Sequence, residues 1–211
     1  MMQKSDLTLG ERAARTRGRP RAFDRARALA QATRLFWVKG YEATSIADLT
    51  QAMGIGAPSL YAAFGSKEAL YAEALRHYEN TYEQLVWAGF HSAPTAREAV
   101  SAFLLDSASA LTGAPDDHPL GCMVTLSAVG SEGHAELGEL VRGARAVTLQ
   151  RLEARLSAAV AAGELRAGTE VHSLARFFQA VQAGMSILAR DGASRAELDA
   201  AARHALARWD A

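Results

Sequence analysis

The chain has 211 residues, of which 49% are hydrophobic and 22% charged, and its formal net charge at pH 7 is zero. This length suffices for one or two domains with a sizeable core, and the composition argues against a disordered chain. No apolar run could span a bilayer, and residues 1–10 contain no hydrophobic signal core. The single cysteine, Cys122, excludes an intramolecular disulfide. We therefore expect a cytoplasmic protein without a membrane partner.

Positive charge is concentrated near the N-terminus. Between positions 12 and 39, nine Lys or Arg residues oppose one acid, Asp24; this excess of +8 leaves the remainder of the chain with −8. Residues 1–22 lack apolar periodicity and are predicted to form a mobile basic arm that contacts a polyanion. Arg17, Arg19 and Arg21 resemble the core of an AT-hook, which fits the narrow minor groove of DNA. A tail that acts only through its general charge is the alternative.

A first helix is predicted from Asp24 to about Lys39. Asp24 is a suitable N-terminal cap, and Gly40 is a suitable stop. Four apolar residues at helical spacing are expected to face inward. They are Leu29, Ala32, Leu35 and Phe36.

The stretch from Thr44 to Lys67 contains two short helical patterns around a glycine-marked turn. Ser45 can cap the first pattern, and Gly54 supplies a residue type that commonly ends a helix. Pro58 lies in the first turn of the second pattern, where proline is tolerated. Two helices joined by a tight turn form a helix-turn-helix, which offers its second helix to the major groove of DNA.

This stretch resembles the DNA-binding domain of the TetR family of bacterial transcriptional repressors over roughly residues 24–75. The resemblance implies an all-α protein with a three-helix DNA-binding domain at 23–66 and a helical ligand-binding and dimerisation domain at 67–211. It further implies a homodimer that binds a palindromic operator and is released by a small organic effector. The matching positions are Thr44, Ile46, Ala47, Ala52, Gly54, Ile55, Ser59, Leu60, Tyr61, Phe64, Ser66, Lys67, Glu68 and Leu70.

The resemblance also implies that Thr44, Tyr61 and Lys67 contact DNA phosphates. Lys67 would combine its positive charge with unpaired N–H groups at a helix start, although a solvated lysine and a tyrosine with a wet hydroxyl are the plain alternatives. Base reading falls to Ala57, Pro58 and Ser59, where only the serine has a polar side chain. This departure from the family pattern shifts the expected specificity toward methyl contacts, DNA shape and the arginine arm.

The rest of the chain is predicted to be helical, without strands. A fourth helix should begin after Ser66 and continue to about Phe90, as a lever between the DNA-reading end and the body. Loop residues occupy 113–121, where two prolines and two glycines interrupt the pattern. Further helices are expected at 95–112, 122–130, 134–162, 169–190 and 195–209.

Two sets of residues in these helices are candidates for binding roles, although ordinary core packing would explain each of them as well. Candidates for an effector pocket are Tyr82, Trp87, Phe103, Met123, Thr125, Phe178 and Gln182. In the resembled family the last two helices form a four-helix dimer interface, for which the candidates are Phe177, Val181, Gly184, Met185, Leu188, Leu198, Ala202 and Leu206.

The motifs of common enzyme and metal classes are missing from the sequence. It contains no G-x-S-x-G, no H-E-x-x-H, no phosphate-binding glycine loop and no cysteine pair. We therefore expect no catalytic residues, no cofactor and no metal. Cys122 opens a predicted helix, so a redox role is a hypothesis beside that of a small buried side chain. The alternative functions are a non-specific architectural DNA binder and a helical small-molecule carrier with a vestigial DNA-binding end.

Overall fold

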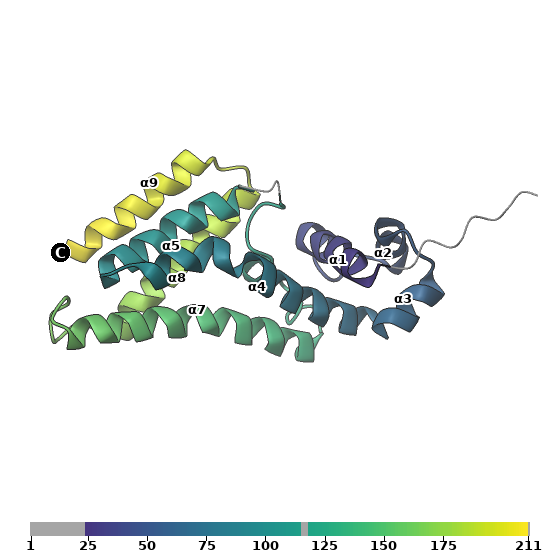
Figure 1. Cartoon of the computed structure of the whole chain (residues 1–211), viewed down its shortest axis with the longest axis horizontal. Coiled ribbons are helices and arrows are strands. Elements are labelled where there is room, and N and C mark those ends of the chain that lie inside the picture. The colour runs from purple at the N-terminus through teal and green to yellow at the C-terminus, as the bar shows by residue number, and fades with distance from the viewer. Residues whose placement is uncertain (1–23, 115–117, 211) are drawn as a thin grey trace, which may run out of the picture.

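The computed structural model describes residues 24–114 and 118–210 (Figure 1). Every regular element in these ranges is a helix, which confirms the all-α fold class. The helices are α1 (Arg25–Lys39), α2 (Ile46–Met53), α3 (Ala57–Phe64), α4 (Lys67–Ser92), α5 (Ala96–Leu111), α6 (Met123–Leu126), α7 (Ala135–Ala161), α8 (Val171–Arg190), α9 (Arg195–Leu206) and the short 3-10 helix η1 (Ala207–Asp210).

The helices form two regions joined by α4. In Figure 1, α1, α2 and α3 gather at one end of the molecule, which we call the head, and α5, α7, α8 and α9 form the body at the other. Helix α4 begins directly after the head and extends into the body, where it packs along α5. The prediction that α4 connects the two regions is therefore confirmed.

Side-chain caps explain where the head helices begin. The Asp24 carboxylate accepts a hydrogen bond from the backbone N–H of Arg27 at 3.0 Å, and the Ser66 hydroxyl accepts one from the N–H of Ala69 at 3.1 Å. Ser45 and Asp48 cap α2 reciprocally, each side chain accepting from the other's backbone N–H. These contacts satisfy N–H groups that the first turn of a helix leaves unpaired.

Helix α2 ends at Gly54, whose φ of +67° lies in the left-handed region that glycine adopts without steric cost. The next helix starts only three residues later, at Ala57. Gly54 therefore produces the tight turn that sets α3 across α2.

The hydrophobic core of the head extends beyond the first three helices. Phe36, Leu49 and Leu60 are buried together with Tyr71 of α4 and Met123 of α6. The first half of α4, the start of α6 and the start of α7 therefore pack with the head, whereas the sequence-based boundary at 66/67 falls where α4 begins.

A second cluster fills the body between α4, α5, α7, α8 and α9. Its largest buried side chains include Phe103, Leu152, Phe178 and Leu198, each at most 1% exposed. Burial of this apolar surface is the main stabilising contribution to the body.

The structure corrects the helix predicted at 122–130. Helix α6 ends at Leu126, and the backbone of Ser127 is extended, with φ −71° and ψ 126°. Arg145 of α7 accounts for this early end, because its guanidinium donates hydrogen bonds to the carbonyl oxygens of Val124, Thr125 and Ser127 at 3.0, 3.0 and 2.5 Å. A side chain from another helix thus satisfies the carbonyls that a longer helix would have paired internally. The helix predicted at 195–209 is likewise divided, into α9 and η1.

Candidate DNA interface and internal cavity

Helix α3 projects from the head with one buried and one exposed side. Leu60 and Phe64 are buried against α1, α2 and α4, four residues apart as expected from the sequence. Pro58, Ser59 and Tyr61 lie on the exposed side, and 47% of the Tyr61 surface is accessible. Ala57, the remaining candidate for base reading, is half-buried. The exposed side therefore offers two hydroxyl groups and otherwise apolar atoms to a ligand.

Lys67 is held at the start of α4 by its neighbours. Its ammonium nitrogen lies 4.2 Å from the centre of the Tyr41 ring, a distance typical of a cation–π contact. The Tyr41 hydroxyl in turn donates a hydrogen bond of 2.9 Å to Glu68, and burial together with this carboxylate raises the pKa of Tyr41 far above its ordinary value. Tyr41 thus stays neutral and positions the Lys67 charge beside the unpaired N–H groups of the first turn.

Thr44 does not lie where its proposed role requires. The residue is fully buried, and its hydroxyl donates a hydrogen bond of 2.6 Å to the carbonyl oxygen of Gly40. This hydrogen bond closes the turn between α1 and α2. In this conformation neither the hydroxyl nor the backbone of Thr44 is accessible to a phosphate, which corrects the expectation from the sequence.

Some cations of the head are already paired within the protein. Arg25 forms an ion pair of 2.8 Å with Glu73, and Lys39 forms one of 3.0 Å with Asp48. The hydrogen bond from the Ser45 backbone, followed by the interaction with Lys39, lowers the pKa of Asp48 to about 2. The candidate minor-groove residues Arg17, Arg19 and Arg21 lie outside the described residues.

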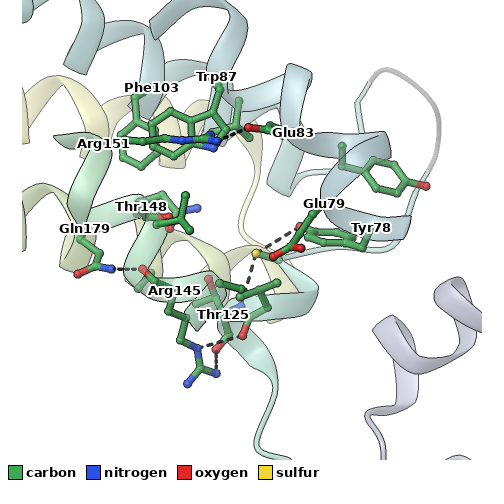
Figure 2. A pocket seen from close by; sticks show the side chains of 18 of the residues that line it. Tyr78, Glu79, Glu83, Trp87, Phe103, Thr125, Arg145, Thr148, Arg151 and Gln179 are labelled. Carbon is green, nitrogen blue, oxygen red and sulfur yellow. Dashed lines mark hydrogen bonds and ion pairs between the residues drawn. The ribbon is translucent and has the colours of Figure 1, made fainter. Parts of the chain in front are cut away.

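The body contains a cavity of about 860 Å³, partly open to solvent, between α4, α5, α6, α7 and α8 (Figure 2). Its size is within the range usual for sites that bind small organic molecules. Five of the seven predicted pocket residues line it: Tyr82, Trp87, Phe103, Thr125 and Gln182. The other two do not, because Met123 is packed in the core of the head and Phe178 in that of the body.

The cavity also contains charged side chains that the sequence pattern did not single out. Glu83 of α4 forms an ion pair with Arg151 of α7, whose guanidinium lies 4.7 Å from the centre of the Trp87 ring. Glu79, one helical turn before Glu83, points into the hollow in Figure 2. In the sequence, Glu79 and Glu83 are spaced i and i+4 beside the apolar stripe of α4, a pattern equally typical of a solvated helix face.

One wall of the cavity touches the head. Tyr78 and Tyr82 line the cavity, and their rings lie 4.7 and 5.0 Å from the ring of Trp37 at the end of α1. The Trp37 indole N–H donates a hydrogen bond of 3.0 Å to the carbonyl oxygen of Gly121, just before α6. A change in the position of either tyrosine would therefore act directly on the end of α1.

Arg190 makes a second connection between the regions. This last residue of α8 donates hydrogen bonds to the carbonyl oxygens of Trp37, Val38 and Leu120 at 2.9, 3.2 and 3.0 Å. One guanidinium thus joins the end of α1, the loop before α6 and the end of α8.

Cys122 lies in the wall of the cavity and is half-buried. Its sulfur accepts a hydrogen bond of 3.3 Å from the Tyr78 hydroxyl and a longer one of 3.5 Å from the N–H of Thr125. The thiol therefore acts as the cap of α6. Helix α6 is only four residues long, which weakens the helix-dipole argument for a reactive thiolate.

The predicted dimer residues divide into two groups. Phe177 and Leu188 are exposed, at 39% and 50%, and Val181 and Gly184 are half-buried. With Ala180 and Ile187 these residues form an apolar stripe along the outer side of α8, at the spacing of one helix face. In contrast, four candidates are buried in the protomer's own core and are therefore not accessible to a second protomer: Met185, Leu198, Ala202 and Leu206.

Metal-binding clusters and membrane-spanning helices are both missing from the part of the chain that the structure describes. Within residues 24–114 and 118–210, no three His, Cys, Asp or Glu side chains are grouped closely enough to hold a metal ion. Among the helices in those ranges, none is sufficiently long and apolar to cross a membrane.

Sequence comparisons connect the head with a known family. The family described as "Bacterial regulatory proteins, tetR family" matches residues 28–74, which contain α2 and α3. The HTH-type transcriptional repressor ComR of Escherichia coli K12 is 36% identical over 200 residues, covering 92% of this chain and 93% of ComR. The repressor BdcR of the same organism is 48% identical over 67 residues, covering 32% of this chain and 34% of BdcR.

Solved structures agree with these relationships. A cysteine mutant of the TetR family transcriptional regulator CifR, complexed with 26-base-pair double-strand operator DNA, has a TM-score of 0.84 and 40% sequence identity to this chain. The match covers 91% of this chain and 100% of the CifR chain. The family resemblance inferred from residues 24–75 is thus confirmed, and the chain belongs to the TetR family of bacterial regulatory proteins.

Proposed function

We propose that this protein is a transcriptional repressor that binds a palindromic operator as a homodimer and releases it when a small organic effector enters the body. The observation that carries the proposal is the packing of Tyr78 and Tyr82 on Trp37, because the same two rings line the cavity. The repressor names of ComR and BdcR, and the operator bound to CifR, support the DNA-binding part.

In this proposal α3 lies in the major groove. Ala57, Pro58 and Ser59 face base edges, while Tyr61 and Lys67 contact phosphates on either side. The exposure of Tyr61 and the fixed position of Lys67 support these roles. With so few polar groups on α3, much of the specificity comes from half-site spacing, DNA shape and the basic arm with Arg17, Arg19 and Arg21.

The outer face of α8 joins two protomers. Phe177, Val181, Gly184 and Leu188 contribute, and their apolar stripe supplies the surface that a two-fold interface buries. In such a dimer the two copies of α3 must reach successive major grooves, ~34 Å apart. The division into head at 23–66 and effector and dimer domain at 67–211 belongs to the same proposal.

Release of the operator follows from the contacts between the head and the body. An effector in the cavity displaces Tyr82 or Tyr78, which shifts Trp37 and with it the head relative to α8. Arg190 fixes the end of α1 to α8, so a rotation of the head is resisted by its three hydrogen bonds and is passed on to the dimer interface. A ligand can shift the equilibrium only by its differential affinity for the two arrangements.

A selection experiment tests the proposal. Duplexes with random inserts are enriched on the purified protein, and the best sequence is compared with an unrelated duplex at physiological salt. A repressor is expected to prefer a palindrome by ~10³-fold or more. Equal affinity for both duplexes would instead favour an architectural DNA binder. No DNA binding together with small-molecule binding would favour a helical carrier.

A further inference from the structure

The cavity has an uneven distribution of charge that indicates what kind of molecule it takes. Each arginine in its wall already has acceptors in the protein. Arg151 is paired with Glu83, Arg145 donates to three carbonyl oxygens of the α6 segment, and Arg176 donates to the Gln179 side chain at 3.0 Å. These guanidinium groups therefore already donate hydrogen bonds within the protein.

Glu79 differs from these arginines. Among the described residues its carboxylate has neither a hydrogen-bond donor nor an ion-pair partner, although it is half-buried and lines the cavity. Burial raises its pKa above the ordinary value, and the nearby Glu83 carboxylate adds to the shift, which Arg151 and Arg76 oppose. A partly buried carboxylate without a partner is unfavourable, so a bound cation would relieve this cost.

The pair formed by Glu83 and Arg151 shows how this wall accommodates a cation. The Arg151 guanidinium lies between the Glu83 carboxylate and the Trp87 ring. Glu79, one turn along the same helix, presents a second carboxylate to the cavity, which Tyr78 and Tyr82 also line, but no cation from the described part of the chain forms an ion pair with it. Organic cations are attracted by the same combination of a carboxylate and aromatic rings.

The cavity wall around Trp87 and Phe103 is mainly apolar, apart from the ion pair of Glu83 and Arg151. Trp87 and Phe103 lie with ring centres 4.9 Å apart, and Val86 and Val147 add aliphatic surface. A molecule of drug-like size that fills about 860 Å³ could thus place an apolar body against these rings and a charged nitrogen near Glu79.

We propose that the effector is an organic cation, an apolar molecule with an amine or ammonium group whose positive charge is recognised by Glu79. This inference rests on the proposed function, because it names the ligand class of the cavity through which the operator is released. Glu79 is a binding residue in this proposal, not a structural one.

The test compares three probes with one phenylalkyl skeleton: phenylbutylamine, phenylbutanol and phenylbutyrate. At neutral pH they are cationic, neutral and anionic, so differences in calorimetric affinity for the full-length protein report the recognised charge. We expect the amine to bind ~10-fold or more tighter than the alcohol, and the carboxylate to bind most weakly.

Variants then assign the preference to one side chain. Glu79→Gln keeps the shape but removes the charge, so the amine should lose its advantage over the alcohol. Glu136→Gln removes a carboxylate from the exposed first turn of α7, outside the cavity, and should leave all three affinities unchanged.

Melting temperatures separate a binding role of Glu79 from a structural one. Since Glu79 has no partner in the described residues, Glu79→Gln should melt at the same temperature as the wild type or higher. A lower melting temperature would identify Glu79 as structural and overturn the assignment. If Glu79→Gln does not fold, Glu79→Asp replaces it: the charge is kept at a shorter reach, and the advantage of the amine should shrink without disappearing.

Two outcomes would overturn the inference: an alcohol or carboxylate that binds as tightly as the amine, or an amine preference that survives Glu79→Gln. The selected operator distinguishes these failures from failure of the proposed function. A protein that binds its palindrome but ignores the amine would remain a repressor with another class of effector. One that binds the amine but no palindrome would keep the cation site and lose the repressor role.

Discussion

The head and the body present opposite kinds of binding surface. The exposed side of α3 offers the Ser59 and Tyr61 hydroxyls among apolar atoms, whereas the cavity has acidic, basic, amide and aromatic side chains around one hollow. The head can therefore gain specificity mainly from where it is placed on DNA, and the body from the chemistry of its wall. The comparison predicts that changes between the regions act on both functions, while changes within the head act on DNA alone.

Trp37→Ala is expected to have the largest effect, because it removes the ring that joins the two regions. Trp37 is 3% exposed and packs on Tyr78 and Tyr82, so its truncation should destabilise the fold by about 3–5 kcal/mol. Thermal unfolding monitored by circular dichroism measures this loss. Trp37→Phe, which keeps an aromatic ring but removes the hydrogen bond to Gly121 and part of the indole volume, should cost less. Equal melting temperatures for wild type and Trp37→Ala would show that the regions are energetically independent.

Deletion of residues 1–21 should have the next largest effect and should act on DNA binding only. Removing the basic arm is expected to lower operator affinity on the order of a hundredfold at low salt. It should also reduce the salt slope by about 0.9 for each phosphate that the arm no longer neutralises. Fluorescence anisotropy at several salt concentrations measures both quantities. An unchanged slope would contradict a role for the arm in DNA binding.

Lys67→Ala is expected to weaken operator binding about tenfold, since it removes one charge-assisted hydrogen bond to a phosphate. The melting temperature should change little, because the ammonium group packs only on the Tyr41 ring. Arg166→Ala removes an exposed cation from the body and serves as the matched control. If both variants weaken binding to the same extent, general charge rather than a specific interaction is responsible.

We expect the smallest effect, on stability, from Asp48→Asn, which alters the N-terminal cap of α2. Because Asp48 has a pKa lowered to about 2 in the folded protein, from an ordinary value of 3.8, its contribution to stability is complete above the ordinary value. That contribution is lost as pH falls toward 2. Asp48→Asn should therefore be less stable than the wild type at neutral pH, and the difference should disappear across that acidic range. Asp191→Asn, exposed after α8, should show no such trend in parallel melts; a constant difference for Asp48→Asn would exclude the ionic cap.

The sequence predicted the head well because its signals are local. Ser45, Gly54 and Ser66 act on N–H and carbonyl groups within four residues of themselves, so each helix boundary can be recognised from adjacent positions. The cavity residues Tyr82 and Trp87 of α4 and Phe103 of α5 could be selected for the same reason, from the spacing within each helix.

The remaining features depend on residues that are distant in the chain. Arg145 shortens α6 from about 20 positions away, and no pattern near 122–130 shows it. The burial of Thr44, Met185 and Leu198 follows from how helices pack, which periodicity within one helix cannot give. Glu79 and Arg151 were missed because a polar residue that faces a cavity has the same sequence signature as one that faces water.

The exposed side of α3, which carries few polar groups, has a consequence for how such a regulator diversifies. Pro58, Ser59 and Ala62 lie at the surface and contribute nothing to the buried core. In the proposed DNA-bound arrangement, substitutions there would change which operator is preferred with little effect on folding. Gly121 shows the opposite behaviour, because a Cβ at this position would lie 2.8 Å from the Ser186 carbonyl oxygen. The proposed reading surface can therefore vary with little cost to folding, whereas the contact between the loop before α6 and the end of α8 tolerates little change.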